Sequence, residues 1–356
     1  MSNFRYLTSG ESHGKCLTAI IEGLPSGLFI DEKFLNEELK RRQLGYGRGL
    51  RQKIESDKVE ITSGVRFGKT LGSPLTLVIK NKDWENWQDI MNLDYNDSQD
   101  EKSFSVPRPG HADYAGAVKY NHKDLRNVLE RASARKTAAD VAVGAVAKLF
   151  LKEIGITGYS KILQIGNATN ENDFKKEIDK AKEEKDSLGG KFEVIFKNLP
   201  IGLGSYVHYD RCIDGKIAQA VMSIPAIRAV SIGDGEGAYS MRGSEFHDEI
   251  FFENGRITRH TNHAGGIEGG MTNGEDLIVK AVMKPIPTVM KSLKSIDLSN
   301  MKEAFAHFER SDTCAVESCA VVAEARIASV VADEILIKFG GDNISEITSR
   351  INCRNF

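Results

Sequence analysis

The sequence lacks any long uninterrupted apolar run. It contains no stretch of about 18 uncharged apolar residues, which is the length that a membrane-spanning helix needs. Its opening residues, MSNFRYLTSG, also lack the apolar core of a secretory signal. We therefore expect a cytoplasmic protein with no membrane partner.

Basic excess and cysteine pairing are also missing. Lysine and arginine number 48 against 50 aspartates and glutamates, so we expect no nucleic-acid partner. The five cysteines are odd in number and show no CxxC spacing, which is typical of a reducing compartment. There is no HExxH motif, and His260 and His263 have no third ligand nearby, so we expect no metal site.

Two glycine-containing segments resemble nucleotide-binding motifs only in part. Residues 64–70 (GVRFGKT) are one residue short of a P-loop and precede a strand-like segment where a helix is required. Residues 233–237 (GDGEG) lack the last glycine of the dinucleotide fingerprint. Neither a P-loop nor a Rossmann site is expected.

The hydrophobic periodicity predicts a mixture of strands and helices. Asp31 is a candidate N-cap of a helix that ends near Gly45, and further helices are expected from about Ser133 and from about Val316 to Phe339. Alternating or β-rich segments predict strands at Leu17–Glu22, Lys58–Gly64, Ser73–Asn81, Lys191–Leu199, Ile217–Met222 and Asp276–Met283.

Grouped strands with few interleaved helices favour an α+β fold over a doubly wound sheet. No repeat or linker divides the chain, so residues 1–356 are expected to form a single domain. Within it, the charged segment 171–187 predicts a surface helix, and the polar segment 86–106 predicts a long loop.

Histidines and arginines stand beside glycines and small residues. His13 lies within GESHG, and His111 follows a rigid Pro-Gly turn in RPGHAD. Histidine exchanges protons near neutral pH, whereas guanidinium groups fork onto phosphate or carboxylate oxygens. A single histidine or arginine is usually structural or exposed, but several in such settings predict a local pocket for small anionic ligands. The segment Arg131–Arg135 also opens a predicted helix, where backbone amides attract anions.

Six blocks of the sequence together resemble the chorismate synthase family. They are GESHG (10–14), RRQLGYGRGLRQKIESDKVEITSGV (41–65), RPGHADYAGAVKY (108–120), ERASARKTAADVAVGA (130–145), TNHAGGIEGGMTNGEDL (261–277) and RSDTCAVESCAVVAEA (310–325). This resemblance implies a β-α-β sandwich of antiparallel sheets around helices. It also implies a lyase that converts 5-enolpyruvylshikimate 3-phosphate to chorismate and phosphate in the shikimate pathway, using reduced FMN without net redox change.

The resemblance further implies roles for individual residues. His13 would protonate the leaving phosphate, His111 would lie near the flavin ring at N1, and Asp312 would help flavin N5 accept the proton from substrate carbon 6. Residues implied to bind the substrate are Arg42, Arg48, Arg51, Arg108, Arg135 and Arg310. Residues implied to bind FMN are Arg131, Ala132, Ser133, Pro225, Ala226, Gly269, Lys284, Pro285, Ile286, Pro287, Thr288 and Arg310.

Family descriptions also assign the positions of Arg42 and Arg48 to NADP, but forked arginines suit a phosphate at the reacting centre, so we favour substrate. NADPH would then act only indirectly, by reducing the flavin. The resemblance implies a homotetramer as well.

Two other classes of function remain to be weighed. A flavin-dependent oxidoreductase acting on an anionic small molecule would use similar residues but would consume reduced flavin with each product molecule. An anion- or RNA-binding module is disfavoured by the paired histidines and the acidic balance of the chain.

Overall fold

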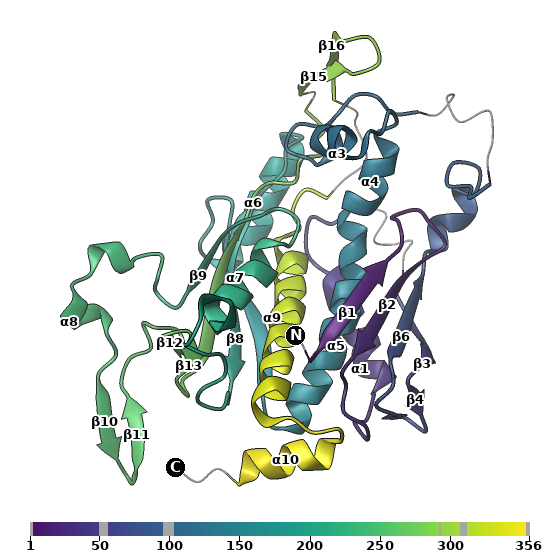
Figure 1. Ribbon diagram of the computed structural model, residues 1–356. Helices are drawn as coiled ribbons and strands as arrows, with labels where there is room; N and C mark the ends of the chain where they lie inside the picture. Colours follow the sequence, from purple (N-terminus) through teal and green to yellow (C-terminus); the bar gives the residue numbers. More distant parts are fainter. Residues whose placement is uncertain (1–2, 50–55, 95–102, 292, 307–311, 354–356) are drawn as a thin grey trace.

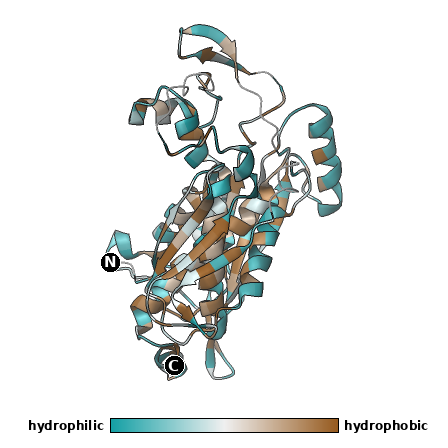
Figure 2. Cartoon of the chain, turned by 90° about the vertical axis from the view of Figure 1, so that its right-hand side faces the viewer, coloured by the Kyte–Doolittle hydropathy of each residue, from teal (hydrophilic) through white to brown (hydrophobic). Residues whose placement is uncertain are grey.

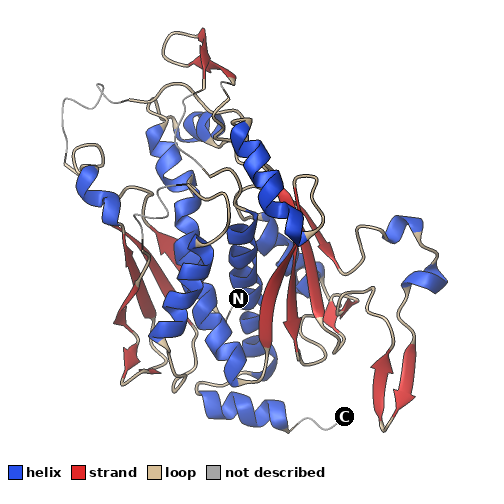
Figure 3. Cartoon of the chain, turned by 180° about the vertical axis from the view of Figure 1, so that it is seen from behind, coloured by secondary structure: helices blue, strands red, loops and turns tan. Residues whose placement is uncertain are grey.

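The computed structural model describes residues 3–49, 56–94, 103–291, 293–306 and 312–353. Two four-stranded antiparallel sheets enclose a layer of helices, as Figures 1 and 3 show from opposite sides. The first sheet has the order β1-β2-β6-β3, with bounds Arg5–Ser9, Cys16–Glu22, Leu75–Lys80 and Val59–Ser63. The second has the order β7-β8-β14-β9, with bounds Thr157–Ile165, Gly190–Lys197, Leu277–Met283 and Ile227–Ile232. The expected α+β sandwich is confirmed.

The helices that form the central layer are α1 (Glu32–Gln43), α5 (Thr137–Glu153), α7 (Ile213–Met222) and α9 (Val316–Phe339). Helices α5 and α9 are buried nearly all round, because each has a sheet or another helix on every side. They approach closely at Gly144, where an added Cβ would lie 2.2 Å from the Cβ of Ala325. One hydrophobic cluster joins both sheets to these helices, and Figure 2 shows the same concentration of hydrophobic residues.

The remaining elements surround this sandwich. The other helices are α3 (Asp113–Tyr120), α4 (Arg126–Ala132), α6 (Glu171–Glu183), α8 (Gly243–Phe246) and α10 (Ile344–Asn352). Short 3-10 turns span Lys82–Asn86, Ala134–Lys136, Tyr209–Arg211 and Ala238–Ser240. Two-stranded hairpins are β4–β5 (Val65–Arg66, Lys69–Thr70), β10–β11 (Ile250–Glu253, Arg256–Arg259), β12–β13 (Ile267–Glu268, Met271–Thr272) and β15–β16 (Lys294–Asp297, Lys302–Phe305).

Most of the expected elements form where the sequence predicted them. Asp31 caps α1 by accepting from the backbone amides of Lys33 and Phe34, and Gly340 ends α9. The false P-loop at 64–70 is the β4–β5 hairpin, so its exclusion was correct.

Two expectations were wrong in detail. Ile217–Met222 is not a strand but part of α7, whose buried residues Ile213, Ile217 and Val221 recur every four positions. The helix expected from Ser133 begins later, at Thr137, because Ser133 ends α4 and caps the 3-10 turn Ala134–Lys136.

Candidate active site

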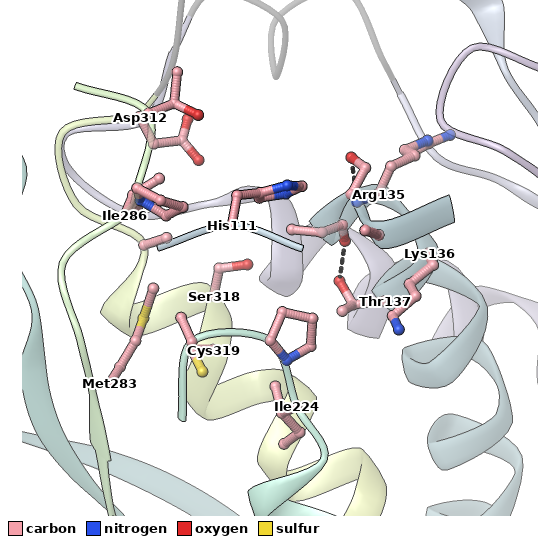
Figure 4. A pocket seen from close by; sticks show the side chains of 18 of the residues that line it. His111, Arg135, Lys136, Thr137, Ile224, Met283, Ile286, Asp312, Ser318 and Cys319 are labelled. Carbon is pink, nitrogen blue, oxygen red and sulfur yellow. Dashed lines mark hydrogen bonds between the residues drawn. The ribbon is translucent and has the colours of Figure 1, made fainter. Parts of the chain in front are cut away.

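A cavity of about 500 Å³ lies where the first turns of α5 and α9 meet the loops before them. Its volume falls in the usual range for a small-molecule or cofactor site. Figure 4 shows Asp312 and Arg135 on opposite sides, with His111 between them and Met283, Cys319 and Ile224 below. The cavity therefore has charged upper walls above a largely apolar floor.

Most residues that the sequence analysis assigned to the site line this one cavity. They are His13, Arg42, Arg48, Arg108, His111, Ala132, Ser133, Arg135, Pro225, Ala226, Lys284, Ile286, Pro287, Thr288 and Asp312. Arg51 and Arg310 lie outside the described residues. The chain thus brings together segments that are up to about 300 positions apart in the sequence.

Three assigned residues lie elsewhere. Arg131 donates to the carbonyl oxygens of Gly10 (2.9 Å) and Thr8 (2.8 Å), so its guanidinium holds the end of β1. Gly269 lies in the turn between β12 and β13, and Pro285 is also absent from the described lining of the cavity.

His13 is buried and held by one carboxylate. Its Nδ1 lies 2.9 Å and 3.0 Å from the two carboxylate oxygens of Glu130, and its backbone amide donates to Oε2 at 2.8 Å. The imidazole also stacks on Trp87, with 3.8 Å between ring centroids. Burial disfavours the charge on Glu130, but His13 and Arg126 outweigh burial and hold the pKa of this carboxyl below its usual range.

His111 belongs to a second charged group at the cavity. Asp113 is fully buried and accepts from Arg108 Nε at 2.9 Å, and its Oδ1 lies 2.5 Å from His111 Nδ1. Arg108 Nη1 also donates to the hydroxyl of Thr288 at 3.2 Å. Burial opposes the charge on Asp113, yet hydrogen bonds from His111 and Arg108 bring the pKa of this carboxyl well below its usual range. Asp113 therefore fixes the orientation of both cavity side chains.

Arg42 and Arg135 share a buried carboxylate. Asp57 accepts from Arg42 Nη2 at 2.8 Å and from Arg135 Nη1 at 2.5 Å. Arg135 also donates through Nε and Nη2 to Asn81 Oδ1. Burial raises the pKa of Asp57, but the two guanidinium groups overcome it and leave that pKa below its usual range. Two positive groups are thus held side by side at the cavity wall.

Asp312 accepts from the backbone amide of Gly49 at 2.6 Å, and its Oδ2 lies 3.0 Å from Arg48 Nη1. Among the described residues, the buried Nε atoms of Arg48 and Arg42 have no hydrogen-bond partner. Buried donors without partners are costly, so these two atoms are suited to an anion in the cavity.

Further cations line the same space. Lys136, Arg228 and Lys284 join the four arginines already described, whereas Asp312 is the one acidic side chain among the described lining residues. Burial lowers the pKa of Lys136, and burial together with Arg228 lowers that of Lys284. Lys284 Nζ donates to the carbonyl of Gly110 at 2.6 Å. The chain has a net charge of -2, yet positive groups are concentrated at this cavity. The cavity is therefore suited to anionic ligands.

Cys319 also lines the cavity, but burial raises its pKa to about 12. Its thiol therefore stays protonated at neutral pH and is not a nucleophile there. Among the described residues, no cluster of three or more potential ligands could hold a metal ion. The helices of the described ranges are all too short or too polar to cross a membrane.

The sequence analysis missed the residues that hold the site side chains. Asp113 follows His111 by two positions, so its proximity gave a usable signal. Glu130 directly precedes Arg131, but nothing local indicated a contact with His13, which is 117 positions away. Asp57 and Asn81 likewise reach the arginines only through the fold.

The chain is similar to known proteins over nearly its whole length. The pattern that defines the chorismate synthase family matches residues 4–336. A chorismate synthase of Thermoanaerobacter pseudethanolicus is 55% identical over 96% of this chain and 96% of its own, and one of Sulfurihydrogenibium sp. is 53% identical over 98% and 97%. A crystal structure of a chorismate synthase aligns with a TM-score of 0.78 at 42% identity, covering 98% of this chain and 96% of that one. The chain therefore belongs to the chorismate synthase family.

Proposed function

We propose that the cavity is the active site in which this shikimate-pathway lyase converts 5-enolpyruvylshikimate 3-phosphate to chorismate and phosphate. The observation that carries the proposal is the joining of His13, His111 and the arginines around one cavity of about 500 Å³. The substrate carries a phosphate and two carboxylates, and forked guanidinium groups recognise such anions. Arg42, Arg48, Arg108 and Arg135 are the groups assigned to it.

The cavity also fits reduced FMN. Its lining includes the apolar residues Ile224, Pro225, Met283 and Ile286, which suit a planar ring system. Ala132, Ser133, Lys284, Pro287 and Thr288 line the same space and are assigned to the cofactor. When bound, reduced FMN would supply electron density for cleavage of the allylic C–O bond and a site for the proton lost from carbon 6.

The protein's own contribution is orientation, charge and one proton. The elimination breaks the C–O bond, and its electron pair leaves on the phosphate oxygen. His13 supplies the proton for that phosphate, and the arginines stabilise the charge that gathers on it. His111, whose ring is fixed by Asp113 and Arg108, would lie near the flavin ring.

Arg48 has two competing partners in this scheme. In the free protein it pairs with Asp312, whereas the bound substrate presents phosphate and carboxylate oxygens to the same guanidinium. Binding of the substrate by Arg48 would therefore break this ion pair. Asp312 is assigned to helping flavin N5 accept the proton from carbon 6, and Arg48 is assigned to substrate binding.

Subunit assembly is a separate part of the proposal. Leu7 and Ile20 are opposite each other on β1 and β2, and both are exposed on the outer face of the first sheet. Such a face suits a contact between copies of the chain, in keeping with the homotetramer implied by the resemblance. Light scattering on the purified protein measures this directly.

The function is tested by an anaerobic assay of chorismate absorbance with the substrate and reduced FMN. His13→Ala should lower turnover about 10²–10⁴-fold while flavin binding is retained. His208→Ala is the control, because His208 is exposed and pairs with Asp210 away from the cavity. Normal turnover in His13→Ala would remove His13 from the mechanism.

A further inference from the structure

We propose that Glu130 is a positioning residue for the reaction: it fixes the ring of His13 and favours the protonated form that donates to the leaving phosphate. The inference rests on the role proposed above for His13. Glu130 itself is 2% exposed and does not line the cavity, so it acts through the histidine.

Glu130 contacts His13 through both its ring and its backbone amide. Both carboxylate oxygens of Glu130 lie within 3.0 Å of His13 Nδ1, and one of them also accepts from the His13 backbone amide. The backbone amide of Ser12 donates to the carbonyl of Glu130 at 2.9 Å. The loop that carries His13 is therefore attached to α4 through backbone and side chain together, and the ring has little freedom to rotate.

The contact with Glu130 determines which ring nitrogen of His13 can donate the reacting proton. A hydrogen on Nδ1 is directed at the carboxylate, so Nε2 is the nitrogen left for the ligand; it has no partner among the described residues. A neutral ring with its hydrogen on Nδ1 has none on Nε2 to donate. His13 can act as an acid through Nε2 only as the imidazolium, and it returns to the Nδ1–H form after transfer.

The charges around His13 are mostly positive. His13 shares its cavity with several cations, all of which disfavour a further positive charge: Arg42, Arg48, Arg108, Arg135, Lys136, Arg228 and Lys284. Arg126 of α4 also lies close, 3.5 Å from Glu130 Oε1. Against them, Glu130 is the carboxylate in direct contact with the His13 ring among the described residues. An opposite charge in direct contact favours the charged form of an ionisable group.

The fourth observation supplies an optical reporter. Trp87 stacks on His13 with an angle of 22° between the rings, and its indole nitrogen donates to Asp83 at 3.0 Å. A protonated imidazole quenches the fluorescence of an indole stacked on it, whereas a neutral one quenches weakly. The chain has two tryptophans, Trp84 and Trp87, so Trp84→Phe leaves Trp87 as the sole emitter.

The experiment follows Trp87 fluorescence against pH in the Trp84→Phe protein without ligands. Glu130→Gln should move the midpoint of quenching down by about one unit or more. Glu130→Asp, which keeps the charge, should restore most of the shift, and His13→Ala should abolish the transition. Glu11→Gln removes an exposed carboxylate from the same loop and should move the midpoint by less than half as much.

Turnover supplies the second measurement. A general acid must be protonated, so activity is lost as pH rises through its titration, and Glu130→Gln should lose kcat at lower pH than the parent protein. KM should change much less than kcat. An unchanged fluorescence midpoint in Glu130→Gln, with Glu130→Asp also unchanged, would overturn the proposal. A shifted midpoint with turnover unaffected at every pH would support the contact between Glu130 and His13 but would overturn the acid role of His13.

Discussion

Arg48 and Asp312 form an ion pair at the cavity, with 3.0 Å between Arg48 Nη1 and Asp312 Oδ2. The backbone amide of Gly49 donates to the other carboxylate oxygen at 2.6 Å, so the loop after α1 is attached to the segment before α9. Arg48 is assigned to substrate binding, and Asp312 is assigned to helping flavin N5 accept the proton from carbon 6. In the free protein the two side chains assigned to these roles therefore form an ion pair with each other.

Replacement of either partner should separate these two roles. Asp312→Asn should lower kcat about 10²–10⁴-fold without raising the KM for substrate, because Arg48 loses a competing anion. Arg48→Ala should mainly weaken substrate binding, by about 1.5–3 kcal/mol. Steady-state kinetics with substrate deuterated at carbon 6 make the comparison, and the isotope effect on kcat should increase in Asp312→Asn. A raised KM with unchanged kcat in Asp312→Asn would mean that Asp312 only orients Arg48.

Asp57 should contribute to stability because it neutralises the two buried arginines Arg42 and Arg135. Asp57→Asn leaves Arg42 and Arg135 buried without their shared charge, so we expect a loss of about 3–5 kcal/mol in the free energy of unfolding. Urea denaturation measures this loss. Asp186→Asn breaks a half-exposed pair with Lys291 and should cost at most about 1 kcal/mol.

The difference in the free energy of unfolding between the parent protein and Asp57→Asn should depend on pH. The pKa of Asp57 is lowered in the folded state, so its contribution is complete above the unfolded value of about 4. It is lost as the pH falls through the folded-state pKa. The difference in the free energy of unfolding between the parent protein and Asp57→Asn should therefore be constant from pH 7 to about 5. It should become smaller on further acidification. A difference that widened in acid would contradict the assignment.

Gly47 should control the position of Arg48. It has φ 85°, and an added Cβ would lie 2.8 Å from Ile178 of α6, while its carbonyl accepts from Thr313 at 2.8 Å. Gly47→Ala should therefore shift the loop and lower kcat/KM about tenfold or more, the change expected for about 1.4 kcal/mol or more of lost binding.

A matched control exists in Gly155, which has φ 82° but nothing within 4 Å of an added Cβ. Gly155→Ala should cost about 1–2 kcal/mol of stability from backbone strain, as Gly47→Ala does, with unchanged kinetics. Equal kinetic losses in the two variants would show that strain alone, rather than displacement of Arg48, causes the effect.

The sequence predicted the long elements and the residues that line the cavity better than it predicted what holds those residues. Strand β6 alternates between buried and half-buried residues, and helix α9 is a long, mainly apolar segment that ends at Gly340. The family blocks contain His13, His111 and the arginines. The short apolar run Ile217–Met222 fitted either period, and packing against α9 and β9 selected the helix.

The supporting residues depend on contacts between distant segments. Glu130 reaches His13 because α4 lies beside the loop after β1. Asp57, which precedes β3, reaches Arg135 in the 3-10 turn Ala134–Lys136. No local pattern predicts such pairs. The helix α6 at 171–183 is another example: its charged face is exposed as expected, but Ile178 packs beside Gly47.

The elimination proposed for this cavity would use reduced FMN catalytically, so that the flavin is reduced again after every cycle. The most direct measurement is the amount of chorismate formed per FMN under anaerobic conditions, with a trace of chemically reduced FMN, excess substrate and no NADPH. We expect many turnovers per flavin, with the flavin spectrum reduced at the end. Oxidation of one flavin for each product molecule would contradict it and would favour the oxidoreductase.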